Sequence, residues 1–168
     1  MERLNHHRHR PLTLISAAAG YGKSTLASDW LESVDVPGAW VTLDENDNDP
    51  RYFLAYFLAA VQSIFPDAAR KTHTLLKASN LPPVATLART LINELDQIEE
   101  EFILVLDDYH TISDKTVHGL IAKLLQHPPA PLSLVLSSRV DPPLPLARFR
   151  ARGQMVEIRV RDLRFSPV

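Results

Sequence analysis

A glycine-containing segment, Ala17 to Thr25 (AAAGYGKST), stands between a short apolar run and an amphipathic stretch. Glycines let main-chain N–H groups turn toward an anion without a steric clash, and the amino terminus of a following helix adds its positive dipole end. Lys23 could reach the β- and γ-phosphates of a nucleotide, and the Ser24 hydroxyl could ligate Mg²⁺. The segment therefore predicts a polyphosphate cradle formed by Ala19, Gly20, Tyr21, Gly22, Lys23, Ser24 and Thr25.

The segment follows the P-loop (Walker A) consensus G-x-x-x-x-G-K-[ST] at Gly22, Lys23 and Ser24. Ala17 stands where the consensus has its first glycine, and Gly20 supplies an extra glycine inside the loop. The competing interpretation is an ordinary strand-to-helix turn with a surface lysine. The apolar run before the segment and the helical pattern after it are the context that the phosphate interpretation requires, and they favour it.

Two acids, Asp107 and Asp108, close the continuous apolar run that begins at Phe102. This is the Walker B pattern, in which a buried strand delivers a carboxylate to the carboxyl edge of a sheet. We predict that Asp107 holds Mg²⁺ together with Ser24, and that Asp108 polarises the attacking water. The competing interpretation is a strand followed by an Asx-type turn. Because open α/β sheets bind ligands at the carboxyl ends of their strands, both motifs are expected to meet in one crevice.

Four further polar residues follow predicted strands. Arg139 comes after the run Leu132–Ser138 and could bind the γ-phosphate as a charge-assisted fork, or could be a solvated loop arginine; both interpretations stay open. Asp44 and Glu45 follow another strand, and solvation of a loop is favoured over orientation of a water. His110 follows the two acids and is expected to help position their loop.

Arginines and histidines also gather near the two ends of the sequence. The C-terminal arginines are expected to form a solvated face or an interface with a further domain, in preference to a nucleic-acid site; they are Arg148, Arg150, Arg152, Arg159, Arg161 and Arg164. His6, His7 and His9 have no acidic or cysteine neighbours, so no metal site is expected there.

Strand and helix patterns alternate along the chain. Strands are expected at Leu12–Ser16, Ala39–Leu43, Phe102–Asp108, Leu132–Ser138 and Met155–Val160. Helical stripes are expected over Lys23–Val34, from Pro50 after Asp49 to Ile64, over Val84–Leu95, and from a Ser113 cap through Leu125. Asp44–Pro50 is expected to be irregular, and Asp67–Asn80 to be a short helix and a loop. This alternation predicts an α/β sandwich around a mainly parallel sheet, with residues 1–168 forming one domain.

Composition excludes several classes of protein. The chain has 168 residues, 45% of them hydrophobic, so it is long enough and apolar enough to bury a core. Eighteen Lys and Arg against 20 Asp and Glu argue against a wholly basic nucleic-acid binder. There is no cysteine, which excludes disulfides, thiolate metal sites and cysteine nucleophiles. No apolar stretch is long enough for a signal peptide or a membrane span, so a cytoplasmic location without membrane contact is expected.

Four blocks of sequence resemble the nucleotide-binding domain of the MalT-like, large LuxR-type transcriptional regulators. The blocks are LTLISAAAGYGKSTLASDWL, WVTLDENDNDPRYFLAYFLAAVQ, FILVLDDYHTI and LSLVLSSRVDPPLPLARFRARGQMVEIRVRDLRFS, which span most of the chain. These regulators belong to the STAND class of signal-transduction ATPases within the AAA-like P-loop division. The resemblance implies a three-layer P-loop NTPase sandwich with a parallel five-stranded sheet in the order 5-1-4-3-2.

The resemblance also implies an ATP/ADP switch that uses Mg²⁺, with Lys23, Asp107, Asp108 and Arg139 carrying the chemistry. Winged-helix and sensor domains are expected to lie in other parts of a longer regulator, and nucleotide-dependent self-association is implied. Direct DNA binding by this chain is not expected. The alternative is a non-catalytic interaction module that keeps the fold and binds nucleotide weakly. A small-molecule kinase is less favoured, because Thr111–Pro131 holds no arginine for a lid.

Overall fold

The computed structural model describes residues 10–18 and 22–159. Five strands pair in parallel: β1 (Leu12–Ser16), β2 (Gly38–Thr42), β3 (Phe102–Asp107), β4 (Leu132–Ser138) and β5 (Met155–Arg159). Their order across the sheet is β2-β3-β4-β1-β5, which is the predicted 5-1-4-3-2 read from the other edge. The prediction of a parallel sheet in this order is confirmed.

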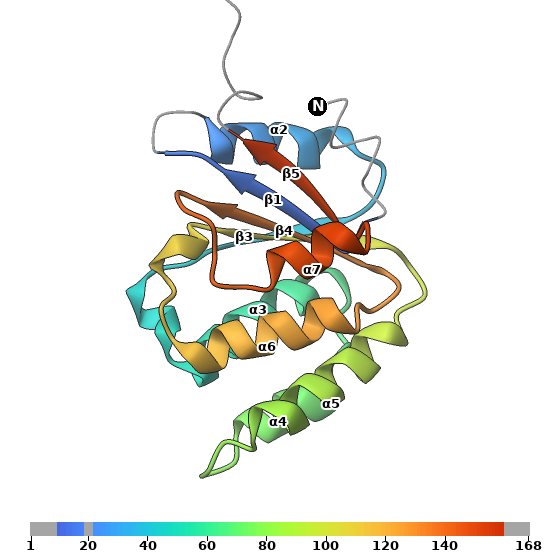
Figure 1. The fold of residues 1–168 in the computed structure, drawn as a ribbon. Coiled ribbons are helices and arrows are strands. Elements are labelled where there is room, and N and C mark those ends of the chain that lie inside the picture. The colour runs from blue at the N-terminus through green and yellow to red at the C-terminus, as the bar shows by residue number, and fades with distance from the viewer. Residues whose placement is uncertain (1–9, 19–21, 160–168) are drawn as a thin grey trace, which may run out of the picture.

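Helices cover both faces of the sheet (Figure 1). Helix α2 (Lys23–Ser33) lies on one face, while α3 (Pro50–Ile64), α6 (Lys115–Gln126) and α7 (Leu146–Ala151) lie on the other. Helix α5 (Val84–Asp96) packs against α6 and against α4 (Arg70–Leu76) at the outside of that layer. Two 3₁₀ turns, η1 (Glu45–Asn48) and η2 (Tyr109–Thr111), follow β2 and β3.

Burial explains why the central strands are rich in apolar residues. Every residue of β1 and of β3 is buried, because helices cover the sheet on both sides. The larger core lies between the sheet and the layer of α3 and α6, and the smaller one packs Trp30 of α2 against Ile15, Val105 and Val135. In the described parts of the chain, no helix is long and apolar enough to cross a membrane.

Two local predictions were wrong, each because a short polar stretch forms its own structure. Asp44–Pro50 contains η1, since Asp44 and Asp47 cap that turn reciprocally. Asp114, rather than Ser113, caps α6, and its Oδ1 accepts a hydrogen bond from the Val117 N–H at 3.0 Å. The proline-rich segment after β4 also leads into a helix that no sequence pattern above predicted, α7, and Pro145 precedes its first residue, where a proline is tolerated. Strand β3 ends at Asp107, one residue before the predicted end, and Val160 lies outside the described residues.

Candidate phosphate and metal site

The carboxyl ends of β1, β3 and β4 lie at one edge of the sheet, because the three strands run parallel side by side. The chain leaves β1 at Ser16 and enters α2 at Lys23, with Gly22 as the residue before the helix. Gly22 has φ +74°, in the left-handed region that side chains other than glycine rarely adopt. This glycine therefore lets the main chain turn into α2 close to the sheet edge, as a phosphate loop requires.

Ser24 and Asp107 form a direct contact between the two predicted motifs. The Ser24 hydroxyl lies 3.0 Å from Asp107 Oδ1 and 2.9 Å from Oδ2, although the two residues are 83 positions apart. Asp107 is buried, and this hydroxyl is its side-chain hydrogen-bond donor among the described residues. A buried carboxylate with a single neutral donor is poorly compensated. Because hydroxyl and carboxylate oxygens are ligands that Mg²⁺ takes, the pair fits that ion.

Lys23 is the first residue of α2 and is buried. Its Nζ lies 3.4 Å from the main-chain oxygen of Ala18, and within the described ranges it forms no ion pair. A buried ammonium group needs compensating charge, so this arrangement suits a bound anion. Thr25 is exposed on the same turn, while the predicted cradle residues Ala19, Gly20 and Tyr21 lie outside the described residues.

His110 links the end of β3 to the end of β4. Its Nδ1 accepts a hydrogen bond from the main-chain N–H of Arg139 at 3.2 Å. Burial lowers the pKa of His110, and the charges of Asp108, Arg139, Lys23 and Asp107 all act on it. Asp108 and Asp107 favour the protonated ring, whereas Arg139 and Lys23 oppose it. The charges of the four residues predicted to carry the chemistry thus all act on one imidazole.

Arg139 itself is exposed just after β4. Its guanidinium makes no hydrogen bond or ion pair with any residue that the structure describes. A solvated arginine at the edge of this site is compatible with both interpretations, the phosphate ligand and the solvated loop residue.

The loop after β2 contributes structure at the same edge of the sheet. Asp44 is exposed, and its carboxylate accepts the Asn46 N–H at 2.8 Å, so it caps η1. Asp47, which the sequence did not single out, is buried; its Oδ2 accepts the Asp44 N–H, and its Oδ1 has no hydrogen-bond partner in the described structure. The spacing of two aspartates three residues apart is the sequence signal of this capping box.

Several of the C-terminal arginines belong to an ion-pair network. Arg150 and Arg159 both pair with Glu157, and Arg159 also pairs with Asp141 in the loop after β4. The hydrogen bond from Arg150 lowers the pKa of Glu157 to about 2, against the opposing effect of burial. Asp141 Oδ1 also accepts the Ser16 hydroxyl at 3.1 Å, which connects the network to the end of β1. Arg161 and Arg164 lie outside the described residues.

A hydrogen bond between a buried tyrosine and a buried histidine holds the segment that follows Asp107 and Asp108 against α6. Tyr109 and His118 are both buried, and the Tyr109 hydroxyl lies 2.8 Å from His118 Nδ1. His118 Nε2 lies 3.1 Å from the carbonyl oxygen of Ile112, which can only accept, so Nε2 carries the proton and Nδ1 accepts from Tyr109. Burial raises the pKa of Tyr109 and lowers the pKa of His118. Both rings are therefore held neutral.

This pair makes stability depend on pH. Because the folded pKa of His118 is lower than its unfolded value near 6.5, the stabilisation is fully present above that value and is lost as pH falls through the folded pKa. We expect the melting temperature to fall by about 2–4 °C more in the unsubstituted chain than in His118→Gln on going from about pH 8 to about pH 5. His127→Gln, at an exposed histidine, is the control and should follow the unsubstituted chain. Equal pH profiles for all three chains would contradict the assignment.

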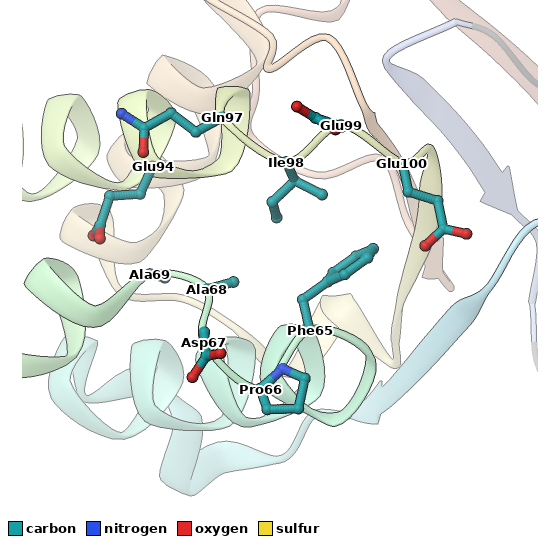
Figure 2. A pocket seen from close by; sticks show the side chains of 10 residues that line it. All are labelled: Phe65, Pro66, Asp67, Ala68, Ala69, Glu94, Gln97, Ile98, Glu99 and Glu100. Carbon is teal, nitrogen blue, oxygen red and sulfur yellow. The ribbon is translucent and has the colours of Figure 1, made fainter.

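A separate cavity of about 500 Å³ lies at the opposite edge of the sheet, between the loop after α3 and the loop that leads into β3 (Figure 2). Phe65 and Ile98 form its apolar side, and its acidic side chains are those of Asp67, Glu94, Glu99 and Glu100. Since β3 starts at Phe102 and ends at Asp107, the length of the strand separates this cavity from the Ser24–Asp107 pair. An acidic cavity does not suit a polyphosphate, so the nucleotide assignment rests on the other edge.

Comparison with known proteins agrees with this geometry. Residues 1–137 match the family model described as the AAA ATPase domain. The chain is 36% identical over 155 residues to the HTH-type transcriptional regulator MalT of Yersinia enterocolitica, and 36% identical over 159 residues to that of Vibrio cholerae. These matches cover 92% and 94% of the chain but 17% of each relative, so the chain spans about a sixth of their length.

Solved structures show the same fold. A Signal Transduction ATPase with Numerous Domains (STAND) protein with a tetratricopeptide repeat sensor, PH0952 from Pyrococcus horikoshii, superimposes with a TM-score of 0.64 at 16% identity, over 95% of this chain and 22% of that one. Cdc6p from Pyrobaculum aerophilum superimposes with a TM-score of 0.52 at 16% identity, over 94% of this chain and 43% of that one. The strand order, the converging motifs and the family match together establish that the chain belongs to the AAA ATPase domain family and has the P-loop NTPase fold.

Proposed function

We propose that the chain is an ATP- and ADP-binding switch module that hydrolyses ATP slowly with Mg²⁺, as part of a MalT-like, LuxR-type regulator. The observation that carries this proposal is the contact between Ser24 and Asp107 at 2.9–3.0 Å, which brings the phosphate loop and the acidic strand end together. The relatives supply the class of the whole protein, since they are HTH-type transcriptional regulators.

In this proposal each residue of the site would have its own role in ATP binding or hydrolysis. Lys23 would bind the β- and γ-phosphates, and Ser24 with Asp107 would hold Mg²⁺, which when bound supplies positive charge beside the phosphate oxygens. Asp108 would accept a hydrogen bond from the attacking water and orient it. Arg139 would bind the γ-phosphate oxygens. We propose slow turnover because a switch depends on the persistence of each bound state.

Other functions of the regulator are assigned to other domains. The chain spans 17% of its MalT relatives, so sensing and DNA binding would belong to the remaining length, including winged-helix and sensor domains. Nucleotide-dependent self-association and a cytoplasmic setting are parts of the same proposal.

Calorimetric titration of the chain with ATP and with ADP, each with Mg²⁺ and with excess chelator, tests the proposal. We expect saturable binding of both nucleotides, tighter with Mg²⁺, and slow phosphate release from ATP. Weak binding that Mg²⁺ does not change, without phosphate release, would instead support the non-catalytic interaction module. No binding of either nucleotide would refute both forms of the nucleotide assignment.

A further inference from the structure

Asn48, the last residue of η1, bridges the loop after β2 and the loop after β3. Its Oδ1 accepts hydrogen bonds from the main-chain N–H groups of Ser113 at 2.6 Å and Asp114 at 2.9 Å, and lies 3.3 Å from the Ser113 hydroxyl. Its Nδ2 donates to the carbonyl oxygens of Thr111 and of Glu45, both at 3.1 Å. Donors face Oδ1 and acceptors face Nδ2, so one orientation of this amide satisfies every contact.

The segment that Asn48 binds is the direct continuation of Asp108. The Thr111 N–H and hydroxyl both donate to the carbonyl oxygen of Asp108, at 3.1 and 2.8 Å. Asp108 has φ +58°, in the left-handed region. Aspartate adopts this conformation more readily than most residues other than glycine, and the hydrogen bonds from Thr111 hold it there. Thr111 fixes the carbonyl of Asp108, and Asn48 fixes the carbonyl of Thr111.

The contacts of Asn48 are not needed to attach β2 to the sheet. The main-chain N–H of Leu43 donates to the Asp107 carbonyl oxygen at 2.9 Å, so the ladder between β2 and β3 already continues to the strand ends. The contacts of Asn48 fall beyond the ladder, on the turn after Asp108. In Figure 1 the two turns, cyan after β2 and yellow after β3, lie side by side at the edge of the molecule.

We propose that Asn48 is a positioning residue that holds Asp108 in its left-handed conformation through Thr111, and thereby fixes the Asp108 carboxylate for water at the γ-phosphate. This inference rests on the proposed function, because it presumes ATP hydrolysis at this edge of the sheet.

The test compares Asn48→Asp with Asn46→Asp, which makes the same chemical change in the same turn. Asn46 is exposed, and its side chain makes no hydrogen bond within the described structure. Asp at position 48 loses the two donated bonds and places a carboxylate oxygen against two carbonyl groups. We expect kcat for ATP hydrolysis to fall about 10- to 100-fold in Asn48→Asp, with Kd for ATP within about threefold of the unsubstituted chain. Asn46→Asp should change neither.

Two further variants separate positioning from general destabilisation. Thr111→Val keeps the shape of the side chain but removes the hydroxyl bond to Asp108, and should lower kcat in the same direction with Kd unchanged. Combined with Asp108→Asn, the Asn48→Asp substitution should cause no further loss of kcat, since both act through one carboxylate.

Three results would overturn the inference: wild-type kcat in Asn48→Asp, a loss of affinity as large as the loss of rate, or independent losses in the double variant. An unsubstituted chain that binds ATP without any hydrolysis would also overturn it, while leaving nucleotide binding intact. An unsubstituted chain that binds no ATP would refute the proposed function itself.

Discussion

Lys23→Ala is expected to weaken binding of ATP and ADP about 10- to 100-fold, which corresponds to the loss of charge-assisted hydrogen bonds to phosphate. Lys23 is a buried cation at the start of α2, and the carbonyl oxygen of Ala18 is a long 3.4 Å from its Nζ. A buried charge with such a weak partner contributes little to folding, so its removal should leave the melting temperature of the free chain unchanged or higher. The affinity loss would then report the phosphate contact alone.

Lys115→Ala is the matched control for this experiment. Lys115 is also the first residue of a helix, α6, but it is exposed. Nucleotide affinity in Lys115→Ala should equal that of the unsubstituted chain. If Lys23→Ala and Lys115→Ala bound ATP equally well, the phosphate-cradle assignment would be wrong.

Asp107→Asn is expected to abolish the Mg²⁺-dependent part of ATP affinity and to lower the rate of ATP hydrolysis about 100-fold or more, because a metal clamp contributes several kcal/mol to this chemistry. The amide oxygen can still accept the Ser24 hydroxyl, which lies 2.9–3.0 Å from the carboxylate oxygens. Since the substitution removes a buried charge, the fold should be retained. Calorimetry with and without Mg²⁺ measures the first effect and phosphate release measures the second.

The control for the second prediction is Asp29→Asn, an exposed aspartate on α2. It makes the same charge change on the helix that begins at Lys23 and should alter neither affinity nor rate. An Asp107→Asn chain whose affinity for ATP still rises with Mg²⁺ would show that the metal is held elsewhere.

The arrangement of the parallel sheet was predictable because its strands give the strongest hydrophobic patterns in the sequence. The runs Leu12–Ser16 and Leu132–Ser138 became β1 and β4 with the predicted bounds, since strands covered on both faces are mostly apolar and their few Ser and Thr residues do not break the pattern. The convergence of Ser24 with Asp107 followed from the parallel arrangement, which places both strand ends at one edge.

The side-chain contacts between loops could not be predicted from the sequence. Asn48 was part of a stretch expected to be irregular, and its role depends on Thr111 and Asp114, which are more than 60 residues away. No local pattern encodes such a contact. Likewise, the arginines near the C-terminus were expected to form a solvated face or an interface, and no local pattern showed that Arg150 and Arg159 pair with acids from β5 and from the loop after β4.

A crystal structure of the chain with ADP and Mg²⁺ tests the central claim most directly. We expect the β-phosphate to contact Lys23 Nζ and Mg²⁺ to lie about 2.1 Å from the Ser24 hydroxyl oxygen. Asp107 should lie beside the metal, so that Mg²⁺ replaces the direct hydrogen bond between Ser24 and Asp107. Density for the nucleotide away from the amino terminus of α2, or a metal with no contact to either Ser24 or Asp107, would contradict the assignment.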